Sequence, residues 1–230
     1  MGDAFIFDTE DGKICGFSSG TAAVVRASQA ASRAIYKGLA IVMTASRPVL
    51  AATDFHDGVI HTFGTEYELQ AGPHFVDPDM APGFAPFNVG FFDDKVYVTY
   101  AKQDTDRKAD VPGPGNGFVD VFNPDGTFVR RLVSGGALNS PWGLTMAPAA
   151  FGALANTLLV GNFGDGTVHA YDPDTGVLRG TITDTSANQF EVRGLWSIAF
   201  GPKEVGEDLF FTAGPSDEDH GVFGSLSVAR

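Results

Sequence analysis

The feature of this 230-residue sequence that most constrains its fold is a strand–turn–strand pattern that returns along the chain. Three copies place an Asp-Gly pair between two short apolar runs, at Asp11-Gly12, Asp57-Gly58 and Asp165-Gly166. An Asp-Gly pair in this setting predicts a β-hairpin, because Gly adopts the positive φ of a tight turn. Two looser copies join residues 96–100 to 118–122 and residues 209–213 to 222–223.

A further short strand is predicted ahead of four hairpins, at residues 36–39, 86–89, 141–144 and 195–198. The equivalent positions Gly38, Asn88, Gly143 and Ser197 follow one another at intervals of 50, 55 and 54 residues. Two hairpins are followed by a Pro-containing turn at residues 123–126 and 172–176, and then by a fourth strand at residues 127–132 and 177–182. Four antiparallel strands repeated about every 50 residues are typical of the blades of a β-propeller.

We therefore predict an all-β fold, a β-propeller of four-stranded antiparallel blades, as a single domain over residues 1–230. A blade of about 46 residues gives five blades, or six if the ends extend. The first copy lacks an initial strand, and the last lacks a fourth strand after Leu226. The composition agrees, because 29 Gly, 13 Pro and an acidic set of 21 Asp against 7 Glu favour turns over helices.

The net charge of −13, from 28 acidic and 15 basic side chains, argues against binding to nucleic acid or to an anionic membrane surface. The single cysteine, Cys15, excludes an internal disulfide and a cysteine-based zinc site. No apolar run approaches the length of a membrane helix, and the N-terminus shows no signal-peptide pattern. These features predict a soluble chain that is cytoplasmic as given.

Two insertions interrupt hairpins at the same place in the repeat, over residues 102–117 and 215–221. Equivalent places in a repeat lie on one face of the fold, so we expect both insertions on a common, ligand-binding face. Residues 22–33 fit either a short helix or a strand of the first blade.

Several runs of this sequence resemble a family of uncharacterised bacterial β-propeller proteins related to NHL repeats. The runs are residues 5–12, 97–104, 112–122, 139–144 (Asn-Ser-Pro-Trp-Gly-Leu), 158–166 and 211–215, so that the resemblance covers essentially the whole chain. It implies a propeller, often exported, whose members carry N-terminal blades that this chain lacks. A more distant likeness is to gluconolactonases and related calcium-dependent lactonases, which implies a divalent ion held in the central channel by Glu, Asn and Asp.

A candidate calcium site comes from the repeat itself. Three positions before Asp11, Asp57 and Asp165 stand Asp8, Asp54 and Asn162, and Asn88 replaces the glycine found at positions 38 and 143. Asp8, Asp54, Asn88 and Asn162 would offer the hard oxygen ligands that Ca²⁺ prefers. The alternative is structural, since Asp and Asn at strand ends commonly bond to their own backbone. We interpret the second acid of each pattern as a turn residue alone.

His56 lies between Asp54 and Asp57 and is the candidate general base. His61 and His169 stand at matching strand positions and are interpreted as structural, whereas His74 and His220 carry no further signal. An exposed histidine without a chemical role is the alternative for His56. Trp142 and Trp196 occupy equivalent repeat positions and are predicted to pack between blades.

Two hypotheses about function follow. The first is a divalent-metal-dependent hydrolase of a small lactone or ester, acyl-homoserine lactones being one class, with Asp54 and His56 in a catalytic site in the channel. The second is a non-catalytic NHL-like propeller that binds a protein or a carbohydrate through its loop face.

Overall fold

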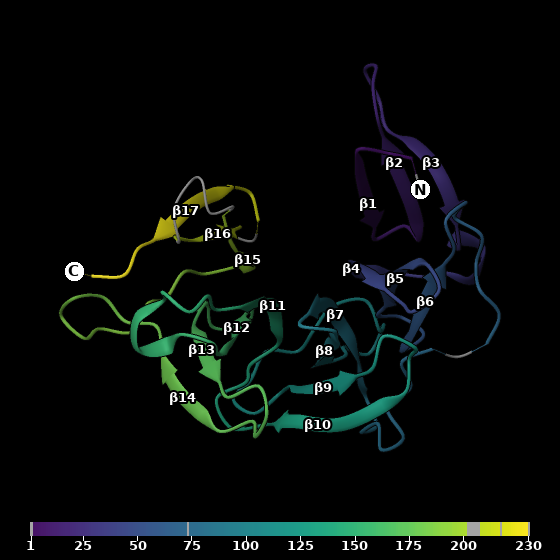
Figure 1. Cartoon of the computed structure of the whole chain (residues 1–230). Helices are drawn as coiled ribbons and strands as arrows, with labels where there is room; N and C mark the ends of the chain where they lie inside the picture. The colour runs from purple at the N-terminus through teal and green to yellow at the C-terminus, as the bar shows by residue number, and fades with distance from the viewer. Residues whose placement is uncertain (1, 73, 202–207, 217, 230) are drawn as a thin grey trace. The chain divides into compact units, whose positions relative to one another are not determined.

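A computed structural model describes residues 2–72, 74–201, 208–216 and 218–229 of the chain (Figure 1). The chain divides into two compact units: Met1–Asp110 with Asp120–Arg130, and Val111–Val119 with Arg131–Arg230. A single domain over residues 1–230 stays a prediction. The described residues are almost entirely strand and turn, which confirms the predicted all-β class. None of their helices is long or apolar enough to cross a membrane.

Two three-stranded antiparallel sheets lie in the first unit. The strand order is β1-β2-β3 in one and β4-β5-β6 in the other. A third sheet, of order β10-β9-β8-β7, begins in the first unit with β7 and β8. The bounds are β1 (Phe5–Thr9), β2 (Lys13–Phe17), β3 (Val24–Ser28), β4 (Tyr36–Met43), β5 (Pro48–Asp54), β6 (Val59–Phe63), β7 (Phe84–Phe92), β8 (Lys95–Lys102), β9 (Phe118–Phe122) and β10 (Phe128–Ser134), with a 3-10 helix at Ala30–Ser32.

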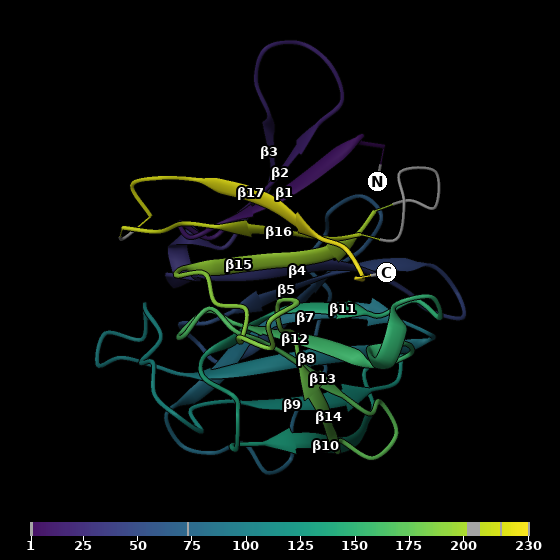
Figure 2. The ribbon, with the colours of Figure 1, turned by 90° about the vertical axis from the view of Figure 1, so that its left-hand side faces the viewer.

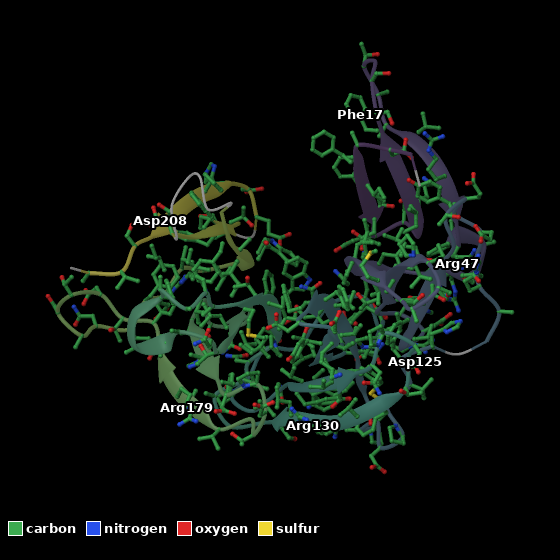
Figure 3. The ribbon with its side chains drawn as sticks, in the orientation of Figure 1. Phe17, Arg47, Asp125, Arg130, Arg179 and Asp208 are labelled. Carbon is green, nitrogen blue, oxygen red and sulfur yellow. The ribbon has the colours of Figure 1, made fainter. Side chains whose placement is uncertain are left out.

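The second unit holds a four-stranded sheet of order β11-β12-β13-β14 and a three-stranded sheet of order β15-β16-β17. The three strands of the latter run side by side in both ribbon views (Figure 2). Arg179 lies on β14, the last strand of its sheet, and its guanidinium pairs with Asp172 at 2.6 Å (Figure 3). The bounds are β11 (Pro141–Met146), β12 (Leu158–Asn162), β13 (Val168–Tyr171), β14 (Leu178–Thr181), β15 (Leu195–Phe200), β16 (Leu209–Ala213) and β17 (Val222–Leu226), with a 3-10 helix at Gly152–Leu154.

The predicted hairpins are confirmed with their turns. Strands β1 and β2, β5 and β6, and β12 and β13 pair antiparallel around the three Asp-Gly turns. The glycine of each turn has the expected positive φ, 75° at Gly12, 70° at Gly58 and 77° at Gly166. Residues 22–33, left open between helix and strand, contain β3 and a single turn of 3-10 helix.

Only two of the five sheets have the predicted four strands in the described residues. The first sheet lacks an initial strand and the last lacks a fourth, as the sequence indicates. The exception is the β4-β5-β6 sheet, where isolated bridges from Phe63 to Leu69 and from Ile60 to His74 take the place of a fourth strand. The connecting segment therefore lies against β6 without forming a regular ladder.

The inner strands of the second unit's four-stranded sheet are buried on both faces. All five residues of β12 and all four residues of β13 are buried, which a sheet exposed on one side would not allow. One core cluster of the first unit brings residues of β2, β4, β5 and β6 together, and a cluster of the second unit joins β12, β13, β15 and β16. Face-to-face packing of neighbouring sheets within each unit is the packing that blades require.

The turn glycines offer a matched test of this packing. A Cβ at Gly166 would lie 2.1 Å from the carbonyl oxygen of Val192, whereas a Cβ at Gly58 would meet nothing within 4 Å. Gly58→Ala should therefore lose only the about 1 kcal/mol that a positive φ costs a non-glycine residue. Gly166→Ala adds a backbone clash and should lose at least about 2 kcal/mol more. Urea unfolding of both variants measures the difference, and equal losses would contradict the packing described here.

Candidate functional site

The candidate site is the turn between β5 and β6 in the first unit. Nδ1 of His56 lies 2.8 Å from Oδ1 of Asp57, so the imidazole N–H donates to the carboxylate. His56 is 8% exposed, and its Nε2 has no hydrogen-bond partner among the described residues. Since Nδ1 carries the proton, Nε2 is the basic nitrogen of this ring.

Asp54 holds this turn in place. Its Oδ1 accepts hydrogen bonds from the backbone N–H groups of Ile35, His56 and Asp57, at 3.0, 3.1 and 3.3 Å. Two of these bonds close the turn on itself, and the third fixes the residue that leads into β4. Asp54 is completely buried, so the three bonds form away from competing water. Its role is to position His56 and Asp57.

Gln103, the first residue after β8, adds a second support. Its Nε2 donates to the backbone carbonyl oxygens of Phe55 and His56, the latter at 3.3 Å. The Phe55 ring packs on that of Phe87 with centroids 5.1 Å apart, so the turn is also fixed from the β7 side. Sequence reasoning missed Gln103, because only the folded chain brings it to a turn more than 45 residues away. It also treated Asp57 as a turn residue alone, although its place next to His56 was a usable signal.

Asp8 and Asp54 stand near the ends of β1 and β5, as predicted, and each keeps one enclosed carboxylate oxygen, Oδ2, without a partner in the described residues. Burial raises the pKa of Asp8 to about 6, with a smaller contribution from the charge of Glu10. Burial also raises the pKa of Asp54, which responds in addition to the charges of His61 and Asp57. Both carboxylates also contribute to the raised pKa of the Tyr36 hydroxyl, after the larger effect of its burial, so both lie near this side chain.

Both asparagine side chains form hydrogen bonds with the backbone. Oδ1 of Asn88 accepts from the N–H of Val89 at 2.8 Å. Asn162, in the second unit, uses Oδ1 to accept from the N–H of Asn139 at 3.1 Å and Nδ2 to donate to the carbonyl of Ala137 at 2.8 Å. Asn162 and Asp54 therefore have the same structural role. Each side chain links a hairpin turn to the segment just before the first strand of its sheet, β11 for Asn162 and β4 for Asp54.

The calcium site of Asp8, Asp54, Asn88 and Asn162 stays a prediction. No group of three or more His, Cys, Asp or Glu side chains in the described ranges comes close enough to hold a metal ion, but this set contains two asparagines. The Oδ1 atoms of Asp54 and Asn88 accept backbone hydrogen bonds, whereas Oδ2 of Asp8 and Oδ2 of Asp54 have no partner in the described residues. The backbone hydrogen bonds at Oδ1 of Asp54 and of Asn162 agree with the structural alternative for these two positions.

Two further histidines and the two tryptophans contact neighbouring side chains. His61 bonds through Nδ1 to the hydroxyl of Tyr36 at 2.9 Å, and His169 lies between the hydroxyls of Thr167 and Thr181, both at 2.9 Å. Trp142 and Trp196 meet edge to face with centroids 5.4 Å apart, which agrees with the predicted packing between neighbouring strands of two sheets.

A pocket of about 460 Å³ lies on the loop side of the second unit. The two insertions reach it, the first through Pro112 and the second through Ser216 and Glu218, beside the turn that follows β12. Residues of both insertions therefore line one pocket, while the common ligand-binding face stays a prediction. The other lining residues of the pocket are Phe163, Gly164, Asp165, Glu191, Arg193, Gly194 and Gly214.

Comparison with known proteins places the chain among propellers. No family model matches it. Two uncharacterised proteins of Acanthamoeba polyphaga mimivirus are 34% and 32% identical over 197 residues, which is 84% of this chain and 48% and 51% of theirs. The chain therefore spans about half the length of the curated relatives it matches. The sequence resemblance predicted bacterial relatives, whereas these relatives are viral. The relation to NHL repeats is not confirmed.

Two solved structures show the fold. A gluconolactonase from Xanthomonas campestris superposes with a TM-score of 0.63 at 15% identity, over 91% of this chain and 65% of that one. An α-L-arabinanase from Penicillium chrysogenum gives a TM-score of 0.55 at 12% identity, over 96% of this chain and 75% of that one. The predicted β-propeller fold class is confirmed.

The raised pKa of Asp8 predicts a pH-dependent stability. The folded protein holds this proton more tightly than the unfolded chain, so the contribution is full below pH 4 and is lost as the pH rises through about 6. Asp8→Asn should therefore match the parent near pH 4 and exceed its unfolding free energy at pH 8, by an amount of the order of 2 kcal/mol. Urea unfolding at pH 4, 6 and 8 tests this.

Asp11→Asn, in the same hairpin, is the control. Hydrogen bonds from Lys13 and Thr9 hold the pKa of Asp11 below its usual value, so its removal should bring no gain at pH 8. If both variants, or neither of them, had a higher free energy of unfolding than the parent at pH 8, the effect of burial on Asp8 would be contradicted.

Proposed function

We propose that the protein hydrolyses a small lactone or ester, with His56 as the general base and Asp57 as the group that orients it. The observation that carries the proposal is the 2.8 Å bond from Nδ1 of His56 to Asp57, with Nε2 left without a described partner on a firmly held turn. A base whose second nitrogen is bound to a carboxylate is the arrangement that activates water or a nucleophile in hydrolases.

The atoms and protons of the reaction balance with His56, one water molecule and the substrate alone. Nε2 of His56 takes a proton from a water molecule, and the water oxygen attacks the carbonyl carbon of the ester. The carbon–oxygen bond to the leaving alkoxide then breaks, and the imidazolium returns the proton to that oxygen, which gives a hydroxy acid from a lactone. The Asp57 carboxylate stabilises the imidazolium that forms. Asp54, predicted as catalytic, acts here as a positioning residue.

The fold supports this reaction class, because one solved structure of the same fold is named as a gluconolactonase. Acyl-homoserine lactones contain the same ester group and belong to the same proposal. No step of this proposal is assigned to calcium.

The test is hydrolysis of glucono-δ-lactone and of an N-acyl-homoserine lactone, followed by acid release at constant pH. His56→Gln should lower kcat/KM at least about 100-fold, the usual contribution of a general base, and Asp57→Asn should lower it less. His220→Gln, which changes an exposed histidine, is the matched control and should leave the rate unchanged. Equal rates in all three variants would refute the role of His56.

A chelator separates this mechanism from the calcium hypothesis. If His56 acts without a metal ion, the rate of hydrolysis and the melting temperature should be the same in EDTA as in millimolar Ca²⁺. A bound ion would instead stabilise the folded state and raise the melting temperature. A loss of both activity and stability in EDTA would favour a metal-dependent site over the His56 base.

A second function, carbohydrate binding, is favoured by the pocket of the second unit. Phe163 lines it and packs on Trp196 with centroids 4.5 Å apart, which provides a supported aromatic face of the kind that stacks on sugar rings. Glu191, Arg193 and Glu218 add exposed charged groups that can bond to hydroxyls. The convergence of both insertions on this pocket supports a role in recognition.

Phe163→Ala should weaken the binding of neutral oligosaccharides at least about tenfold, as measured by isothermal titration calorimetry across a panel of glycans. Phe223→Ala removes a phenylalanine that is 72% exposed and lies outside this pocket, so it should have no effect. Parent protein that binds no glycan in the panel, or equal affinities in the two variants, would contradict the second function.

A further inference from the structure

Strand β1 of the first unit has a free edge. Among the described residues it pairs with β2 alone (Figure 1). In the repeat, β1 corresponds to β5, β8, β12 and β16, and each of those strands pairs on its second edge with the strand that precedes it in the chain. An unpaired edge presents a row of backbone N–H and C=O groups to which another strand can add.

One backbone hydrogen bond recurs in the four sheets that have such a preceding strand, here called the first strand. The residue that follows the second strand donates its N–H to the carbonyl oxygen of the residue that precedes the first strand. The bonds run from Phe55 to Ile35, Gln103 to Gly83 and Gly214 to Gly194, each at 2.8 Å, and from Phe163 to Ser140 at 2.9 Å. This bond therefore marks where a first strand begins beside its hairpin.

Asp8 of β1 carries the side-chain acceptor that belongs to this arrangement. Oδ1 of the equivalent Asp54 accepts the N–H of Ile35, just before the first strand β4. Oδ1 of Asn162 accepts the N–H of Asn139, just before the first strand β11. Oδ1 of Asp8 accepts no hydrogen bond from another described residue, and only Oδ2 of this carboxylate is enclosed by protein. Oδ1 can therefore receive a backbone N–H that arrives along the edge of β1.

The apolar side chains of β1 are also uncovered. Phe5 and Phe7 are 60% and 47% exposed, whereas all five residues of the equivalent strand β12 are buried. The ring of Phe5 lies 6.5 Å from that of Phe17 on β2, so these rings form one apolar surface. The side chains of a strand added to β1 would lie beside this surface and remove part of it from water.

We propose that the free edge of β1 binds an extended segment of another polypeptide as an added antiparallel strand. The first strands of the other sheets give its pattern: an aromatic residue, then Gly, Asn or Ser, then Leu, Val or Ile. Three of them have this pattern, at Phe87-Asn88-Val89, Trp142-Gly143-Leu144 and Trp196-Ser197-Ile198. A backbone N–H ahead of the pattern donates to Oδ1 of Asp8. The site does not depend on the hydrolase proposal.

The added strand comes from a different protein rather than from a second copy of this chain. All four first strands of the described residues are already paired within their own sheets. A second copy would have to break one of these sheets to supply the segment. The net charge of −13 also opposes the approach of two copies.

A synthetic peptide with the sequence of residues 137–147, blocked at both ends, is the probe, because it contains the pattern and the donor at Asn139. Fluorescence anisotropy of the labelled peptide should show saturable binding. Hydrogen exchange followed by mass spectrometry should then slow in residues 5–9 and stay unchanged in residues 222–226 of β17, another edge strand. A peptide with Asn139→Pro lacks the N–H and should bind about tenfold more weakly.

Variants of the protein test the acceptor. Asp8→Ala removes Oδ1 and should weaken binding of the unmodified peptide about tenfold. Asp8→Asn keeps an Oδ1 acceptor, as Asn162 has in its own sheet, and should bind within about threefold of the parent. Asp11→Ala, in the same hairpin, is the matched control and should bind like the parent. The peptide with Asn139→Pro tests the same bond without altering the protein.

Three results would overturn the proposal. The first is no saturable binding by the folded parent up to about 1 mM peptide. The second is equal binding of both peptides, or protection of residues 222–226 in place of residues 5–9. The third is a parent that is dimeric in analytical ultracentrifugation and whose residues 5–9 are protected without peptide, because a second copy would then occupy the edge.

Discussion

The fold depends on one small interaction that recurs: a side-chain oxygen at the end of a hairpin's first strand accepts backbone N–H groups. Asp54 does this for its own turn and for Ile35, and Asn162 does it for Asn139. In both cases a local turn is tied to the segment that enters the first strand of a sheet. A hairpin alone is marginally stable in water, so this tie helps to convert isolated hairpins into sheets that can pack on one another.

The same interaction divides the two carboxylate oxygens of Asp54. Its Oδ1 accepts three backbone hydrogen bonds, whereas its Oδ2 has no partner in the described residues. The turn that Asp54 organises, however, presents the next two side chains in a fixed relation. The geometry of the His56–Asp57 pair therefore depends on the turn that Asp54 holds in place.

The hairpins could be predicted because their signals are local. The Asp-Gly turns and the alternation of apolar residues lie within about ten residues of one another, and the structure confirms them from β1–β2 to β12–β13. Features that depend on how distant segments of the chain pack together could not be predicted in the same way. Gln103 reaches the turn at Phe55 and His56 only through the tertiary fold, and the irregular bridges at Leu69 and His74 replace a strand where repetition alone predicted one. Residue type located the carboxylates, but only their surroundings could show which atoms were already bonded.

The three Asp-Gly turns differ in how much space surrounds them. A Cβ at Gly12 would lie 2.8 Å from the Ala34 carbonyl oxygen and one at Gly166 would lie 2.1 Å from that of Val192, whereas the surroundings of Gly58 are open. The backbone of other segments therefore packs closely against two of the three turns. The third turn, which carries His56, borders an apolar pocket at Gly58. Among the three turn glycines, Gly58 is therefore the position where protein engineering can introduce a side chain with the least damage to the scaffold.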